Sequence, residues 1–149
     1  MIKPILNYNN KEDKKILSTP SCEVVDIKSV EVQKTIQDLK DTLNVVKGGK
    51  GLSAIQIGVP IKICICSWAN KTIIMINPKI LRTRGKAKYL EGCLSVPGKL
   101  KTIERAQKVW CTFINENGSP EEIAEGGRMS NIIQHELDHM EGICKIIED

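Results

Sequence analysis

The 149-residue chain has few aromatic side chains and no long apolar run. Its five aromatic residues leave little ring surface on which nucleic-acid bases could stack. The longest run without a charged residue, 51–61, contains eleven residues and is too short to cross a membrane. The N-terminal segment also lacks the apolar stretch of a secretory signal. We therefore expect a soluble, cytoplasmic protein that binds neither a membrane nor nucleic acid directly.

Histidine is scarce, and neither sign of charge dominates. The formal net charge of +4 comes from 22 basic and 18 acidic residues that are interspersed along the chain. Six cysteines without a secretory context indicate reduced thiols that pack as small apolar side chains. We expect Cys64 and Cys66, two apart on a predicted strand, to be core residues of this kind. The length predicts one domain, residues 1–149.

Hydrophobic periodicity predicts two helices and three strands. Apolar residues spaced three and four apart indicate a helix from Ser29 to about Gly48. Alternation and β-rich composition predict a hairpin and one further strand. The expected strands are 61–67, 72–77 and 108–114. The second helix runs from about Gly126 to Gly142, and residues 1–27 are expected to be irregular. Five basic residues within 79–88 indicate a solvated strand and turn rather than a nucleic-acid patch.

The second helix carries both histidines of the chain, in the motif His135-Glu136-x-x-His139. Residues four apart on a helix differ by about 40° of rotation and one turn of rise, so both imidazoles can reach one metal ion. Glu136 lies at the edge of the same face, where its carboxylate can accept a proton from a water that the metal has acidified. The motif therefore predicts metal-dependent hydrolysis at a carbonyl group.

The third protein ligand does not follow from the motif. The long zinc-protease pattern requires a histidine where this chain has Lys145, and a protonated lysine is not a ligand. Only ten residues follow His139, so the ligand is expected upstream, or less readily at Cys144. Among the upstream thiols we favour Cys93, because the adjacent Gly92 lets the backbone run close to a ligand.

Three motifs, taken together, resemble the peptide deformylase family. Segment 49–56 reads GKGLSAIQ, segment 91–95 reads EGCLS and segment 134–139 reads QHELDH. Alone, the first segment would indicate only a turn followed by a strand. The likeness extends over about 16–142, nearly the whole chain, and resembles the short form reported from phages. It implies an α+β fold in which small, mostly antiparallel sheets surround a central metal-binding helix.

The resemblance also implies what the site residues do. Cys93, His135 and His139 would hold one divalent metal, natively Fe(II), with zinc, nickel or cobalt as substitutes. Glu136 would be the general acid/base. The Gln56 amide and the Leu94 backbone N–H would stabilise the oxyanion. The expected substrate-binding residues are Gly49, Gly51, Gly92 and Asn131.

The implied reaction removes the N-formyl group from the initiator methionine of nascent peptides and releases formate. The expected compartment is the cytoplasm, which is the host's cytoplasm if the chain is phage-encoded. The sequence lacks the C-terminal helix through which many bacterial members dock on the ribosome, so we do not expect that docking. Two alternatives stay open: a zinc endopeptidase that uses the same helix, and a non-catalytic metal-binding homologue.

Several polar residues near the motifs require partners. Metal-binding histidines usually donate their second N–H to a carboxylate, and Glu91 is our candidate. Asp138 lies near the C-terminal end of its helix, where the helix dipole disfavours a negative charge, so we expect Arg105 beside it. Ser53 and Ser130 replace alanines that are usual in the family, and each hydroxyl would need a partner if buried. Asn131 replaces an apolar residue and could alter the side-chain preference of the enzyme.

Overall fold

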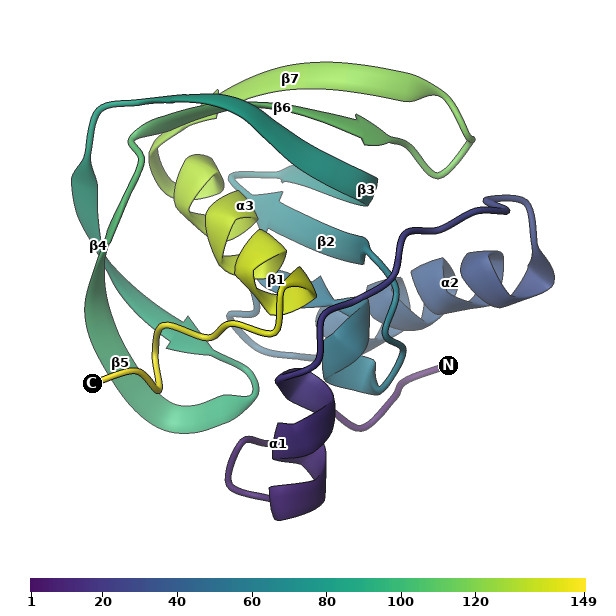
Figure 1. Cartoon of the computed structure of the whole chain (residues 1–149), viewed down its shortest axis with the longest axis horizontal. Coiled ribbons are helices and arrows are strands. Elements are labelled where there is room, and N and C mark those ends of the chain that lie inside the picture. Colours follow the sequence, from purple (N-terminus) through teal and green to yellow (C-terminus); the bar gives the residue numbers. More distant parts are fainter.

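The computed structural model describes residues 1–149, and its central element is a helix, α3 (Gly127–Met140), that lies between two antiparallel sheets (Figure 1). The larger sheet has the strand order β1-β2-β3-β6-β7, and the smaller is the β4-β5 hairpin. The strands are β1 (Gly51–Ser53), β2 (Ile63–Trp68), β3 (Lys71–Arg84), β4 (Ala87–Cys93), β5 (Val96–Arg105), β6 (Lys108–Ile114) and β7 (Pro120–Gly126). The expected α+β class is confirmed.

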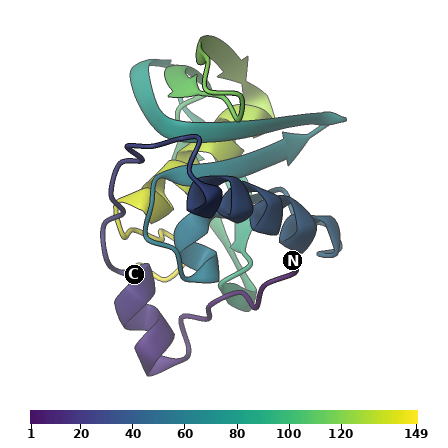
Figure 2. The same ribbon diagram turned by 90° about the vertical axis from the view of Figure 1, so that its right-hand side faces the viewer.

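The larger sheet is covered by a helix on each face. Successive side chains of a strand point to opposite sides, so one strand can contribute to both of these contacts. Ile63 and Ile65 of β2 pack in the cluster that includes α2 (Val30–Asn44). Cys64 and Cys66, which alternate with these isoleucines along β2, pack on the other face with Ile133 of α3. Figure 2 shows α2 lying across the molecule below the strands of this sheet. The two cysteines are therefore core residues, as expected.

The first long helix begins where the sequence predicts. The Ser29 hydroxyl accepts a hydrogen bond from the Val32 N–H at 3.2 Å, which caps the helix N-terminus. The helix ends at Asn44, a few residues before the glycines that were expected to stop it. None of the three α-helices combines the length and the apolarity that crossing a membrane requires.

The predicted strands are present, and one is much longer than expected. Strand β6 has the predicted bounds, and β2 pairs with β3 as the expected hairpin. Strand β3 continues to Arg84, with irregular register near Ile76 and Ile80. Its second half carries much of the basic segment, whose charged side chains are exposed as expected. These side chains are Lys79, Arg82, Arg84, Lys86 and Lys88.

Other parts of the sequence-based prediction were wrong or incomplete. The N-terminal region is not wholly irregular, because α1 (Lys11–Leu17) forms there, capped by Asn10 and anchored by buried Leu17. Glu12 and Asp13 lie in its first turn and Lys14 and Lys15 in its last, which suits the helix dipole. Strands β4, β5 and β7 were not predicted. Gln56 lies in a short 3₁₀ helix, η1 (Ala54–Ile57), so the alternative reading of segment 49–56 as a turn followed by a strand does not describe this residue.

Gly142, just after α3, allows a test of how the end of this helix is held. Its φ of +76° is left-handed, and an added Cβ would lie 2.5 Å from the Ser18 carbonyl oxygen. Gly48 has a similar φ of +74° but no neighbouring atom within 4 Å. We expect Gly142→Ala to lower the free energy of unfolding by about 1 to 3 kcal/mol more than Gly48→Ala does. Urea unfolding of both variants measures the difference, and equal losses would contradict the packing described here.

Candidate metal centre and active site

Helix α3 and the end of β4 bring the predicted metal ligands together. The His139 Nε2 atom lies 3.3 Å from Cys93 Sγ and 3.1 Å from His135 Nε2. In a tetrahedral site with ordinary bond lengths these separations would be about 3.6 and 3.4 Å. Burial, followed by the neighbouring His135, lowers the pKa of His139 well below its usual range, which favours the neutral imidazole that binds metals. The donors therefore suit one divalent ion.

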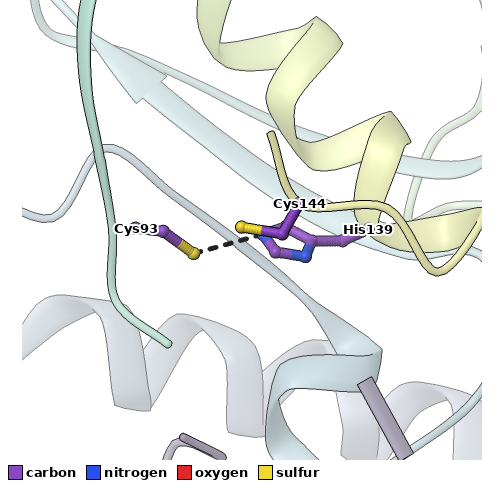
Figure 3. Close-up of side chains that lie close together, drawn as sticks. All are labelled: Cys93, His139 and Cys144. Carbon is purple, nitrogen blue, oxygen red and sulfur yellow. Dashed lines mark hydrogen bonds between the residues drawn. The ribbon is translucent and has the colours of Figure 1, made fainter. Parts of the chain in front are cut away.

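A second thiol joins this cluster. The three donors that lie mutually within 4.8 Å are those of Cys93, His139 and Cys144 (Figure 3). The Cys144 thiol, followed by burial, raises the pKa of Cys93 well above its usual range. Cys93 would bind a metal as the thiolate, so metal binding would release the proton of this thiol. The sequence analysis ranked Cys144 below Cys93 as a ligand, and the structure places both beside His139.

Glu91 on β4 fixes the orientation of the first histidine. Its Oε1 lies 2.9 Å from His135 Nδ1, so His135 Nε2 is the atom left free for a metal. The Arg105 guanidinium donates to both oxygens of Glu91 and, at 2.6 Å, to Asp138. Burial alone would raise the pKa of Glu91, but the hydrogen bonds from Arg105 and His135 outweigh it and lower the pKa to about 2. Both expected pairings, Glu91 with a histidine and Asp138 with Arg105, are confirmed.

The Glu136 carboxyl is buried beside the metal ligands. Burial raises its pKa to about 7, so it can both accept and donate a proton near neutral pH. The Ser53 hydroxyl lies 3.0 Å from Glu136 Oε1, which gives this buried hydroxyl the partner that the sequence required. A Cβ at Gly51 would lie 2.6 Å from Oε2, so only glycine leaves this carboxyl its space. Ser130 also has a partner, the Ala106 carbonyl at 3.0 Å.

Two hydrogen-bond donors lie next to Cys93. The Gln56 Nε2 donates to Ser95 Oγ at 3.0 Å and lies 3.7 Å from Cys93 Sγ. The Gln56 Oε1 accepts from the Ser53 N–H, which fixes which end of the amide faces the cysteine. The Leu94 N–H, in the turn between β4 and β5, has no protein acceptor. These two groups are where an oxyanion at the metal site would need donors.

A cleft of about 660 Å³ opens onto the site. Its lining includes Glu136, His135 and Cys93, and also every residue that the sequence analysis named for substrate binding. Those residues are Gly49, Gly51, Gly92 and Asn131. The cleft is also lined by charged side chains, among them Lys50, Lys99 and Arg128. Its aliphatic residues are Leu90, Leu94, Val96, Leu100 and Ile132.

One cleft residue that sequence reasoning missed is Arg128, in the first turn of α3. Its guanidinium lies over the rings of Trp68 and Tyr89, with centroids at 5.9 and 5.3 Å, and donates to Asn131 Oδ1 at 2.9 Å. The Asn131 Nδ2 donates to Glu91 at 2.5 Å. Asn131 therefore directs its amide toward Glu91 and Arg128. No sequence signal marked Arg128, because its partners come from β2 and β4.

This arrangement of donors, buried carboxyl and cleft is what a metal-dependent hydrolase requires, and comparison with known proteins identifies the family. The family model of polypeptide deformylase matches residues 2–147. A peptide deformylase of Aquifex aeolicus is 40% identical, over 96% of this chain and 85% of that protein. One of Helicobacter pylori is 34% identical, over 93% of this chain and 81% of that protein.

Solved structures agree with the sequence comparison. A peptide deformylase from Legionella pneumophila superposes with a TM-score of 0.90 at 31% identity, over 99% of this chain and 87% of that one. One from Thermotoga maritima gives a TM-score of 0.89 at 26% identity, over 98% and 96% of the two chains. The chain belongs to the polypeptide deformylase family. It is a hydrolase that removes the formyl group from N-formylated nascent peptides.

The Glu91 pKa leads to a test of the Arg105 network in protein stripped of metal. A carboxyl whose pKa is about 2 in the fold and 4.5 in the unfolded chain stabilises the fold fully above pH 4.5, and loses this effect as the pH falls toward 2. We expect Glu91→Gln to lower the free energy of unfolding at pH 7 by about 3 to 5 kcal/mol, because Arg105 loses a buried partner. The loss should shrink as the pH falls from 4.5 toward 2.

Glu104→Gln is the matched control, because Glu104 lies beside Arg105 on β5 but is exposed. Urea unfolding at pH 7 and pH 3 should show no more than about 0.5 kcal/mol of change for this variant. A Glu91→Gln loss as small as that of the control, or one that does not depend on pH, would show that Glu91 does not stabilise the fold as an ion.

Proposed function

We propose that Cys93, His135 and His139 bind the metal of this enzyme and that Glu136, Gln56 and Leu94 carry out the chemistry around it. The proposed ion is Fe(II), with zinc, nickel or cobalt as substitutes, and the proposed compartment is the cytoplasm, where formylated nascent peptides are made. The observation that carries the proposal is that one cleft is lined by a buried carboxyl with a pKa of about 7 and by two of the donors, Cys93 and His135. The third donor, His139, lies 3.3 and 3.1 Å from these two.

The metal supplies one part of the chemistry. When bound, a divalent ion acts as a Lewis acid that acidifies water and polarises a carbonyl oxygen. Three protein donors leave the fourth tetrahedral position open for such a ligand. Glu91 supports this arrangement, because its hydrogen bond to Nδ1 directs the other nitrogen of His135 toward the ion.

Glu136 moves the proton. Its Oε1 is held by the Ser53 hydroxyl, which leaves Oε2, beside Gly51, to take a proton from the attacking water. The same oxygen returns the proton to the amine as the C–N bond of the formamide breaks and formate leaves. A pKa of about 7 suits a group that must do both near neutral pH.

Gln56 and Leu94 stabilise the charge that develops on the formyl oxygen. The Gln56 amide is aimed by Ser53 and Ser95, and the Leu94 N–H has no competing acceptor. Donors that are already in place cost no reorganisation during the reaction, and removing one such donor typically lowers the rate about 10²- to 10³-fold. Both groups lie beside Cys93, so they would face the same oxygen.

The cleft holds the peptide. Gly49 and Gly51 line the cleft just before and at the start of β1, the edge strand of the larger sheet, where an extended peptide can pair as an added strand. Gly92 lines the cleft at the end of β4. Asn131 and Arg128 add polar side chains to the wall of the cleft, so the pocket for the first side chain is less uniformly apolar.

Glu136→Gln tests the proposed acid/base directly. We expect formate release from formyl-Met-Ala-Ser to fall about 10²- to 10⁴-fold, because the amide cannot accept the proton. The metal content should stay near that of the parent chain, since Glu136 is not a ligand. The measurements are formate release and metal analysis on protein purified without oxygen.

Glu141→Gln is the control, because Glu141 lies just after the same helix and is exposed, 3.6 Å from Lys62. This variant should retain full activity. Near-normal formate release by metal-loaded Glu136→Gln would exclude Glu136 as the acid/base. Loss of metal from that variant would instead show that Glu136 is itself a ligand.

A further inference from the structure

Cys144 is a buried thiol at the metal centre to which the proposed reaction gives no role. It comes from the segment after α3, whereas Cys93 comes from the end of β4. Figure 3 shows both thiols pointing toward the His139 ring from different parts of the chain. The donor atoms of the three residues lie mutually within 4.8 Å. The cluster therefore offers a metal ion two sulfur atoms.

Cys144 approaches this cluster from the protein interior. Its residue surface is 4% exposed, and it packs in an apolar cluster with Leu17, Val96 and Ile146. It is not among the residues that line the substrate cleft. A ligand at this position would hold the ion from the side of the core, without occupying the space of the peptide.

The distances are close to those that a metal requires. Two sulfurs on one tetrahedral zinc lie about 3.8 Å apart, and a sulfur and an imidazole nitrogen lie about 3.6 Å apart. The three donor atoms lie within 4.8 Å of one another, so they would have to approach by at most about 1 Å to bind one zinc ion. Residues 141–149 form turns and irregular backbone, so Cys144 can shift without breaking a helix or strand. The His139 Nδ1 has no hydrogen-bond partner, so this ring is less constrained than that of His135.

We propose that Cys144 is a second thiolate ligand for zinc, so that zinc is held by Cys93, Cys144, His135 and His139. Two cysteines and two histidines are the donor set of closed structural zinc sites, which keep no open position. Zinc would then block the centre, and removal of the Cys144 thiol would reopen it for hydrolysis. This inference rests on the metal ligands proposed above and adds a property of this chain's own sequence.

X-ray absorption at the zinc edge counts the sulfur ligands directly. Metal-free protein is loaded with one equivalent of zinc, and we expect two sulfurs per zinc in the unmodified chain and one in Cys144→Ala. Cys111→Ala, which removes an equally buried thiol from β6, should keep two. Competition with a chelator should show zinc binding at least about tenfold weaker in Cys144→Ala, because a direct ligand is lost.

The unmodified chain alone decides whether the Cys144 thiol binds zinc, even if a variant folds poorly. One sulfur per zinc in the unmodified chain would overturn the role of Cys144 and leave the proposed catalytic set intact. Failure to bind zinc at all would overturn both proposals. Formate release by zinc-loaded Cys144→Ala above that of the zinc-loaded parent would support the closed site, and equal or lower release would contradict it.

Discussion

The guanidinium of Arg105 joins the two parts of the molecule that make up the active site. It binds Glu91 on β4 and Asp138 on α3, so it ties the small hairpin to the central helix. Taking such charges out of water is costly, and only complete hydrogen bonding offsets the cost. Glu91 also accepts hydrogen bonds from His135 and Asn131, so each of its two oxygens has two hydrogen-bond partners. The same contacts that hold the hairpin in place therefore orient His135, a proposed metal ligand.

The helix that carries the chemistry can be buried because its polar residues have partners. Ser130 and Gln134 donate to the Ala106 carbonyl, and the Gln134 side-chain oxygen accepts from the Ala106 N–H. The apolar residues of this helix, among them Ile133, pack in the core against the larger sheet. Burial raises the pKa of Glu136, so the packing that stabilises the fold also sets the pKa of the proposed proton acceptor. The burial of α3 therefore contributes both to the stability of the fold and to the raised pKa of Glu136.

The local parts of the site were predictable, and the parts assembled by tertiary packing were less so. His135, Glu136 and His139 are recognisable because helix geometry fixes residues one turn apart. The hairpin β4-β5 escaped prediction because exposed positions carry Leu90 and Leu100 and a buried position carries Glu91, which removes the alternation of apolar and polar residues that marks a strand. The role of Arg105 was inferred from a helix dipole, whereas Arg128 and the proximity of Cys144 depend on how separate elements meet.

The α1 helix was missed for a related reason. It is short and mostly polar, and only Leu17 is buried, so it carries no amphipathic stripe that a sequence pattern can reveal. Its place depends instead on the chain around it, including the Tyr8 N–H, which donates to the Ser95 carbonyl at 2.9 Å. A sequence pattern therefore predicts the helices that have their own apolar face. The position of a short polar helix such as α1 depends on its tertiary contacts.

The central claim is that this cleft holds one metal and uses it to hydrolyse a formamide. The most direct test is formate release from formyl-Met-Ala-Ser by the unmodified protein, purified without oxygen and analysed for metal in the same sample. The account predicts one divalent ion per chain and formate release that stops when a chelator removes the ion. Formate release that persists without metal, or an iron-loaded chain that releases none, would contradict it.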